Sequence, residues 1–216
     1  MNRKTIFISV AGILILAFVM ASLIYKNYQS GLQGASGGRN QSVVERQGAP
    51  IKGPADAKVT IVEFFDPACG TCADFYPLVK KLIDQYPGKV RVMMRYAPLH
   101  KGSDEVVKML EAAHLQGKFF PALELLFNNQ QRWVVNHVSQ PTRAQGILNG
   151  MALNHNELTA DLNGPVVTQA IQQDIKDGQA LNISATPEFF VNGQPLSSFG
   201  YQQLSQLVKQ AVDEAY

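Results

Sequence analysis

The sequence predicts an α/β domain that is interrupted by a helical insertion and preceded by an N-terminal transmembrane helix. Three observations support this fold class. Residues 58–99 show a strand–helix–strand pattern, residues from about 103 to 181 lack convincing strands, and residues 187–216 show a hairpin followed by a helix. A chain of 216 residues is long enough for one good-sized domain that contains an insertion.

The first 25 residues form an apolar segment of the length that crosses a bilayer. Arg3 and Lys4 precede about 20 uncharged residues, 5–25. Because basic residues stay cytoplasmic, we expect residues 1–25 to be a single-pass anchor in the inner (cytoplasmic) membrane, with the N-terminus cytoplasmic and the catalytic domain periplasmic or extracytoplasmic. The alternative is a signal peptide cleaved near Ala21, which would release a secreted periplasmic form. Both interpretations place the domain in an oxidising compartment.

Residues 26–52 are rich in Gly, Ser and Gln and show no sustained apolar period. This composition predicts a flexible linker with a reach of roughly 25–30 Å. The folded domain is therefore expected to span residues 53–216.

The charge distribution argues against a nucleic-acid partner. Residues 1–48 hold five basic residues and one acidic residue, whereas the remaining residues hold 14 basic and 16 acidic residues. A slightly acidic domain has no excess positive charge with which to attract a phosphate backbone.

The domain itself begins with a predicted βαβ unit. Residues 58–65, "KVTIVEFF", are β-branched and aromatic and predict a buried strand, and residues 73–88 have helical spacing. Residues 89–99 alternate and predict the next strand, which is parallel to the first because the crossover is right-handed. The helical insertion then covers about 103–181.

The last part of the domain is predicted to be a hairpin and a helix. Residues 187–199 read as two short strands with Asn192 and Gly193 at the turn, and residues 201–216 have an amphipathic helical pattern. The order βαβ, insertion, ββα is that of a thioredoxin fold with a helical insertion subdomain.

Cys69 and Cys72 are the only cysteines of the chain. A structural disulfide is a poor explanation, because closing a four-residue loop removes only about 2 kcal/mol of unfolded-state entropy, against about 4.7 kcal/mol for a hundred-residue loop. A zinc site is also a poor explanation, because it needs about four ligands and no second cysteine pair or paired histidine spacing is present. A redox pair remains.

The position of the two cysteines favours this redox interpretation. Cys69 follows a strand where a helix should begin, so free amides and the macrodipole would stabilise its thiolate. Cys72 lies one turn further on and could resolve a mixed disulfide on Cys69. Glu63 shares a strand face with Ile61 and Phe65, so burial should raise its pKa and allow it to relay protons to Cys72. The alternative for Glu63 is an edge position that reaches solvent.

Two motifs carry a resemblance to a known family. "VEFFDPACGTC", with "ISATPEFFVNG" downstream, resembles the DsbA-like thiol–disulfide oxidoreductases of the thioredoxin superfamily over residues 50–216. The resemblance implies that Cys69 is the nucleophile, that Cys72 is the resolving thiol, and that the two form a redox-active disulfide. It implies that Thr186 and Pro187 form a cis-proline loop that binds an extended substrate segment. Glu63 matches the family's buried acid.

His100 lies in a "PLH" stretch that resembles the family, but an ordinary histidine at a helix entry is the interpretation we favour.

We therefore expect an extracytoplasmic enzyme that exchanges disulfides with folding proteins, with oxidation as the main direction. Its expected partners are thiol-containing client proteins and a membrane redox partner of the DsbB type. It should need no cofactor and no metal beyond its own disulfide. DsbA-type oxidases commonly carry Pro-His between the cysteines, whereas this chain has Gly70 and Thr71, which should make its disulfide less oxidising.

Two alternatives follow. One is a disulfide isomerase or reductase kept reduced by a membrane electron donor. The other, of a different class, is a metallochaperone that binds copper(I) through the two thiols.

Overall fold

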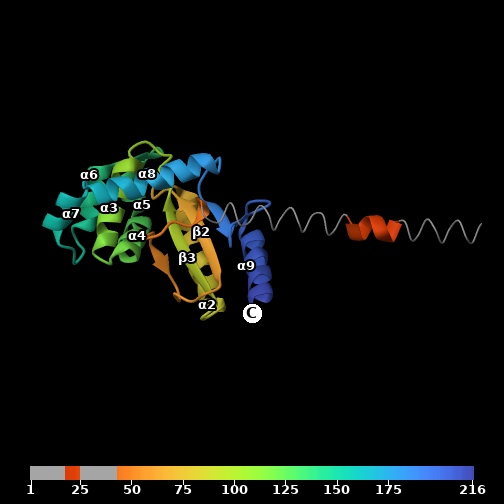
Figure 1. The fold of residues 1–216 in the computed structure, drawn as a ribbon. Coiled ribbons are helices and arrows are strands. Elements are labelled where there is room, and N and C mark those ends of the chain that lie inside the picture. Colours follow the sequence, from red (N-terminus) through yellow and green to blue (C-terminus); the bar gives the residue numbers. More distant parts are fainter. Residues whose placement is uncertain (1–17, 25–42) are drawn as a thin grey trace, which may run out of the picture. The chain divides into compact units, whose positions relative to one another are not determined.

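The computed structural model describes residues 18–24 and 43–216 (Figure 1). Residues 18–24 form a helix, and they belong to a unit separate from the domain that begins at Gln41. The rest of the predicted anchor, and residues 26–42 of the predicted linker, lie outside the described residues. Within the described ranges, no helix is both long enough and apolar enough to span a membrane.

A five-stranded sheet forms the centre of the domain, in the order β1-β3-β2-β6-β7. The strands are β1 (Ile51–Lys52), β2 (Val59–Phe65), β3 (Val90–Tyr96), β6 (Glu188–Val191) and β7 (Gln194–Pro195). The predicted parallel pair is confirmed, since β2 and β3 run parallel, and the other neighbouring pairs are antiparallel. Every residue of β2 is buried, which agrees with its β-branched and aromatic composition.

Helices cover both faces of this sheet. On one face, α2 (Gly70–Gln85) and α9 (Tyr201–Ala215) bury Val79, Leu82 and Val208 in the core cluster that includes Ile61 and Phe65. Phe64 and Phe190 form a second, smaller cluster with Val62. The side chain of Asp174 in α8 (Pro165–Ala180) pairs with that of Arg95 in β3, whose guanidinium lies 4.9 Å from the Phe64 ring centre.

The predicted hairpin is confirmed. It connects β6 to β7 through Asn192 and Gly193, whose φ angles are +48° and +80°. Two successive positive φ values are those of the type I′ turn that an Asn-Gly pair favours. The Asn192 side chain also accepts a hydrogen bond from the Thr60 backbone N–H.

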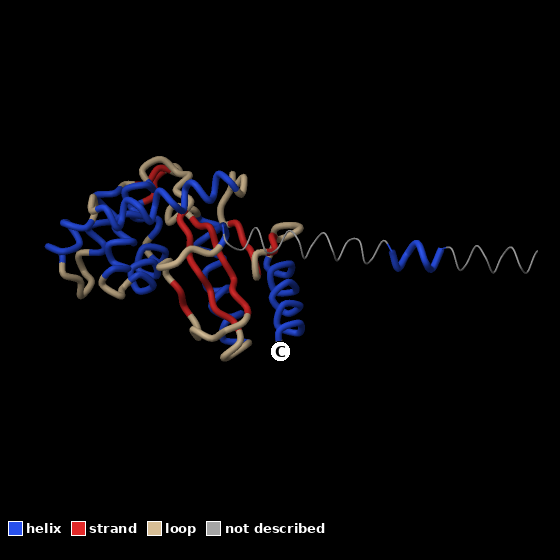
Figure 2. The backbone as a smooth tube through the Cα atoms, in the orientation of Figure 1, coloured by secondary structure: helices blue, strands red, loops and turns tan. Residues whose placement is uncertain are grey.

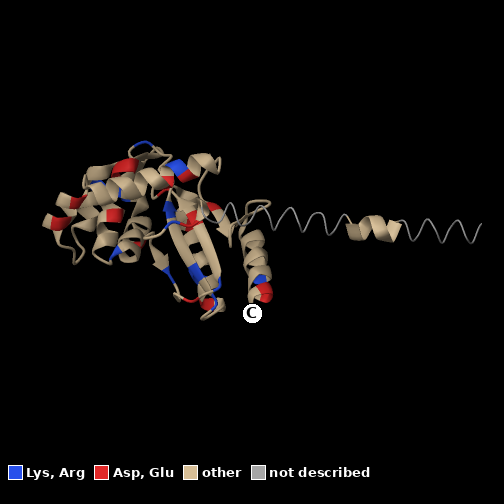
Figure 3. Ribbon diagram, in the orientation of Figure 1, with Lys and Arg blue, Asp and Glu red and all other residues tan. Residues whose placement is uncertain are grey.

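The insertion consists of α3 (Ser103–Leu115), α4 (Phe119–Asn128), α5 (Gln130–Trp133), α6 (Pro141–Leu148), α7 (His155–Asp161) and α8. Figure 1 shows these helices gathered at one side of the sheet, with α9 at the other. Acidic and basic residues are interspersed over the domain rather than collected on separate elements (Figure 3).

The prediction that this block contains no strand is wrong. Strands β4 (Val134–Val135) and β5 (Val138–Ser139) form a small separate sheet, visible beside the helices in Figure 2. Asn136 and His137, at φ +50° and +61°, make the turn. Strands of two residues are too short to produce an alternating pattern of apolar and polar residues. Asn136, a residue type that favours hairpin turns, is therefore the only indication of this hairpin in the sequence.

The predicted boundary between linker and domain at residue 53 is also wrong, because the folded domain includes residues 43–52. The Val44 side chain is fully buried, and strand β1 pairs with β3. Arg46 forms an ion pair with Asp174, 128 residues away. A single buried valine and one long-range ion pair leave no periodic pattern in a Gly- and Ser-rich sequence.

We expect Val44→Ala to lower the free energy of unfolding by about 2 kcal/mol, because it removes buried methyl groups and leaves a cavity. Val43→Ala is the matched control, since the Val43 side chain is only partly buried, and its effect should be under about 1 kcal/mol. Denaturant unfolding of both variants measures the difference. Equal and negligible effects would mean that residues 43–52 behave as a linker.

Candidate active site

Cys69 lies in the loop between β2 and α2, directly before the first residue of the helix. It is the N-cap residue of α2, with extended backbone angles (φ −74°, ψ 119°), and its carbonyl accepts a hydrogen bond from the Ala73 N–H. The sequence places it at the start of the helix, as the structure does. Cys69 is 6% exposed and Cys72 is fully buried, and both are free thiols in this structure. Of the two cysteines, only Cys69 therefore keeps some exposed surface.

The surroundings of Cys69 lower its pKa to about 5. The largest contribution is a hydrogen bond from Cys72, followed in the same direction by the Thr186 side chain and by the backbone amides of Cys72 and Thr71. Burial opposes these contributions. The sequence analysis assigns the stabilised thiolate to the helix N-terminus alone, but the neighbouring thiol contributes more than the amides do.

The pKa of Cys72 is shifted the opposite way, well above its ordinary value. Burial is the main cause, and the hydrogen bond to Cys69 and the nearby negative charge of Glu63 add to it. At neutral pH the pair therefore consists of one thiolate at Cys69 and one protonated thiol at Cys72. This division suits a nucleophile and a waiting resolving group.

Thr186, which directly precedes Pro187, lies against Cys69 although it is 117 residues away in sequence. The peptide bond between Thr186 and Pro187 is cis, and the Cys69 Sγ lies 3.2 Å from the Thr186 carbonyl oxygen. A carbonyl oxygen only accepts, so this bond requires a protonated Cys69, whereas the Thr186 hydroxyl can donate to the thiolate. The structure thus brings together the four residues that the sequence analysis groups: Cys69, Cys72, Thr186 and Pro187.

Glu63 is completely buried in β2, which contradicts the alternative of an edge position. Neither carboxyl oxygen has a hydrogen-bond partner among the described residues. Burial, and secondarily the charge of Cys69, raise the pKa of Glu63 to about 8. When ionised, the Glu63 carboxyl also raises the pKa of Cys72, so the protonation of the acid and that of the buried thiol influence each other.

The sequence analysis misses Asp66, which organises the loop before Cys69. Its buried carboxylate accepts hydrogen bonds from the Ala68 N–H at 2.8 Å, the Ser103 hydroxyl at 2.7 Å and the His100 N–H at 2.7 Å. The His100 ring nitrogen Nδ1 lies 2.9 Å from the same carboxylate. His100 therefore helps to hold the loop before Cys69 through its contacts with Asp66. An Asp-Pro pair directly after a strand is a turn signal that could have pointed to Asp66.

Gln130 is the second residue that the sequence analysis misses. Its side-chain amide donates to the carbonyl oxygens of Pro67 and Cys69, at 2.9 and 3.0 Å. The redox loop is therefore held by residues from two helices of the insertion, α3 and α5.

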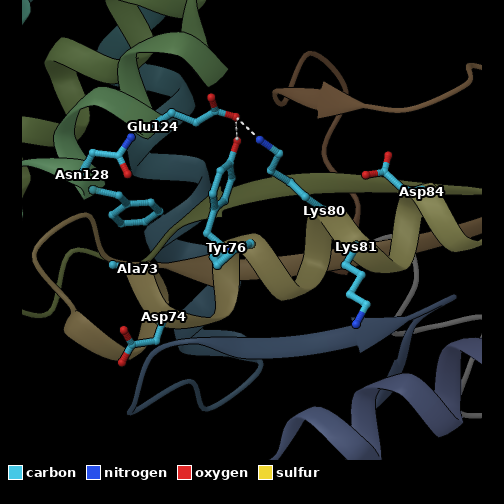
Figure 4. A pocket seen from close by; sticks show the side chains of 10 residues that line it. Ala73, Asp74, Tyr76, Lys80, Lys81, Asp84, Glu124 and Asn128 are labelled. Carbon is cyan, nitrogen blue, oxygen red and sulfur yellow. Dashed lines mark hydrogen bonds and ion pairs between the residues drawn. The ribbon is translucent and has the colours of Figure 1, made fainter.

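An open pocket of about 500 Å³ lies along α2, beginning at Ala73, one turn beyond Cys69. Figure 4 shows Tyr76 and Lys80 of α2 directed at Glu124 of α4, and the Glu124 Oε1 accepts from both at 2.9 Å. Two of the charged residues that line this pocket, Lys80 and Glu124, thus form an ion pair with each other. In the part of the chain that the structure describes, no three His, Cys, Asp or Glu side chains are grouped to hold a metal ion.

Comparisons with known proteins agree with this geometry. A thioredoxin family model matches residues 45–210. The crystal structure of a thioredoxin-like oxidoreductase from Silicibacter pomeroyi DSS-3 superimposes with a TM-score of 0.69 at 29% identity, covering 82% of this chain and 98% of that one. Oxidised BdbD from Bacillus subtilis gives 0.65 at 25% identity, covering 77% and 94%.

A curated relative is a much longer protein. The Na(+)/H(+) antiporter NhaA of Herminiimonas arsenicoxydans is 31% identical over 146 residues, which is 68% of this chain and 22% of the antiporter. The chain spans 22–24% of the length of the first curated relatives that it matches.

Proposed function

The chain belongs to the thioredoxin family, and we propose that it is a thiol–disulfide oxidoreductase of the DsbA-like type that works outside the cytoplasm as an oxidase of folding client proteins. The observation that carries this proposal is the division between the two thiols. Cys69 has a pKa of about 5 and lies against Thr186, while Cys72 is buried and stays protonated. A reduced form stabilised in this way makes the corresponding disulfide a stronger oxidant.

The reaction begins with the Cys69–Cys72 disulfide. A client thiolate attacks the Cys69 sulfur, so the bond between the two cysteines breaks and Cys72 leaves with the electron pair. Glu63, protonated at neutral pH because its pKa is about 8, supplies the proton that Cys72 takes up. The client is then joined to Cys69 in a mixed disulfide.

A second client thiolate attacks the client sulfur of this mixed disulfide. The client disulfide forms, and Cys69 leaves as a thiolate, which its low pKa favours. The enzyme has gained the two electrons that the client lost. In the mixed disulfide Cys69 carries no proton, so the Thr186 carbonyl is free to accept a hydrogen bond from the extended client backbone. Aromatic side chains at Phe75 and the exposed Phe199, with ring centres 4.8 Å apart, supply an adjacent apolar contact.

Reoxidation of the dithiol needs an electron acceptor, and we propose a membrane partner of the DsbB type. The proposal includes the single-pass anchor at residues 1–25, supported by its uncharged sequence between Lys4 and Lys26. Such an anchor would keep the domain near that partner.

Direction and location can be tested in one experiment on the full-length chain. Thiols are blocked in intact cells, the membrane and soluble fractions are separated, and the redox state of Cys69 and Cys72 is read in each. We expect the protein in the membrane fraction, mainly as the disulfide, with a reduction potential between about −120 and −180 mV. Mainly dithiol protein, with a potential below about −230 mV, would instead indicate the isomerase or reductase.

A further inference from the structure

Gln130 is the side chain of the helical insertion that binds the backbone carbonyls of the redox loop at Pro67 and Cys69. A carboxamide nitrogen carries two hydrogens, so Gln130 can donate to the Pro67 and Cys69 carbonyls simultaneously. Pro67 is buried, and its carbonyl would otherwise have to find another donor in a dry environment. The amide oxygen of Gln130 faces Gly70, since a Cβ added there would lie 3.9 Å from it.

The base of this side chain is fixed. Gln130 begins the short helix α5, and Trp133 at the other end of α5 is completely buried. The Trp133 indole donates to the Leu126 carbonyl at 2.9 Å, and the Trp133 carbonyl accepts from the Gln140 N–H at 2.7 Å. The side-chain amide of Gln130 therefore reaches the redox loop from a helix, α5, whose position is fixed by the buried Trp133.

The Cys69 carbonyl receives two donors, Gln130 from the insertion and the Ala73 N–H from the helix. The Gln130 amide and the Ala73 N–H together fix the orientation of the peptide group that follows Cys69. This orientation in turn sets the direction of the Thr71 and Cys72 backbone amides, which donate to the Cys69 sulfur. We propose that Gln130 is a positioning residue that couples the helical insertion to the redox loop and holds Cys69 toward Thr186. This inference rests on the proposed role of Cys69 as the nucleophile.

The chemistry of this position requires a neutral donor. Methionine has similar length but no N–H, so Gln130→Met leaves both carbonyls without their donor. Glutamate has the same shape, but Gln130→Glu places an acceptor, charged when ionised, against two carbonyl oxygens and beside the Cys69 thiolate. Both variants should disorder the loop and disfavour the thiolate, and the glutamate variant should do so more strongly.

The test uses the reduced full-length chain. Thiolate absorbance at 240 nm is titrated with pH, and the equilibrium with glutathione is measured. For Gln130→Met we expect the pKa of Cys69 to rise by about half a unit to one unit, and the disulfide to become about three- to tenfold less oxidising, which corresponds to about 15–30 mV. Gln130→Glu should exceed both shifts. Gln131→Met, at the exposed neighbouring residue, is the matched control and should change neither quantity.

A different pattern would overturn the inference. If Gln130→Met and Gln130→Glu lower the melting temperature but leave the titration and the glutathione equilibrium unchanged, Gln130 is only a structural residue. The proposed function is judged separately, on the unsubstituted chain: a Cys69 that titrates there like an ordinary thiol, near 8.5, would remove its support whatever the variants do.

Discussion

Cys69→Ser is expected to abolish disulfide transfer to a reduced client, with a loss of at least roughly a thousandfold, because the serine hydroxyl forms no disulfide and is not ionised near neutral pH. The fold should survive the change, since serine is close to cysteine in size. The measurement is the rate at which the oxidised chain converts a reduced client protein to its disulfide form. Retained oxidising activity in Cys69→Ser would remove the proposed mechanism.

Two substitutions at Cys72 sharpen this experiment. Both leave the nucleophile in place and remove the resolving thiol, so attack of the Cys69 thiolate on the disulfide of an oxidised client should give a mixed disulfide that Cys72 can no longer resolve and that therefore accumulates. They differ at the hydrogen bond that contributes most to the low pKa of Cys69. Cys72→Ser keeps a donor, whereas Cys72→Ala does not, so the pKa of Cys69 should rise clearly further in the alanine variant. Equal titration curves would show that the Cys72 hydrogen bond is not the main cause.

Local patterns were sufficient to predict the centre of this site. Cys69 follows a buried strand and precedes a helix, and these two periodicities place it at a helix start whatever surrounds it. The burial of Glu63 was one of two interpretations that its place in the strand allowed, and the structure supports it over an edge position. The placement of Thr186 and Pro187 beside Cys69 depended on the family resemblance, because no local pattern joins residues 117 positions apart.

The long-range contacts that support the site and the domain could not be predicted for a related reason. Gln130 reaches the Cys69 carbonyl across 61 residues, and Arg46 reaches Asp174 across 128. Each is one polar side chain in a segment with no distinctive period. Contacts from a side chain to a backbone carbonyl leave no trace in the partner's residue type, so only the folded structure reveals them.

The stability of the reduced protein should depend on pH through Glu63. Its pKa is about 8 in the folded protein against 4.5 for an unperturbed glutamate, so the folded state binds the proton more tightly. The stabilisation is fully present below pH 4.5 and is lost as the pH rises through 8, at about 1.4 kcal/mol per pH unit, on the order of 3–5 kcal/mol in all. Glu63→Gln cannot ionise, so it lacks this loss of stability and keeps only the opposite contribution of Cys69, whose lowered pKa of about 5 makes the fold more stable as the pH rises.

The quantity to measure is the difference in unfolding free energy between the parent and Glu63→Gln at several pH values from 5 to 9. Glu157→Gln, at an exposed position in α7, is the matched control and should follow the parent. A parent and a Glu63→Gln variant with parallel profiles would show that the Glu63 carboxyl is not protonated at neutral pH.

The same substitution separates the two influences on Glu63. Its pKa is raised first by burial and then by the Cys69 thiolate, and the second influence disappears when Cys69 is in a disulfide. The difference in unfolding free energy between the parent and Glu63→Gln should therefore depend less on pH in the oxidised proteins than in the reduced proteins, because the subtraction removes the titration of Cys69 itself. If Glu63 also supplies the proton to Cys72, Glu63→Gln should slow client oxidation by about a hundredfold, at the low end for general acid catalysis. Loss of the pH dependence without loss of rate would limit Glu63 to an electrostatic role.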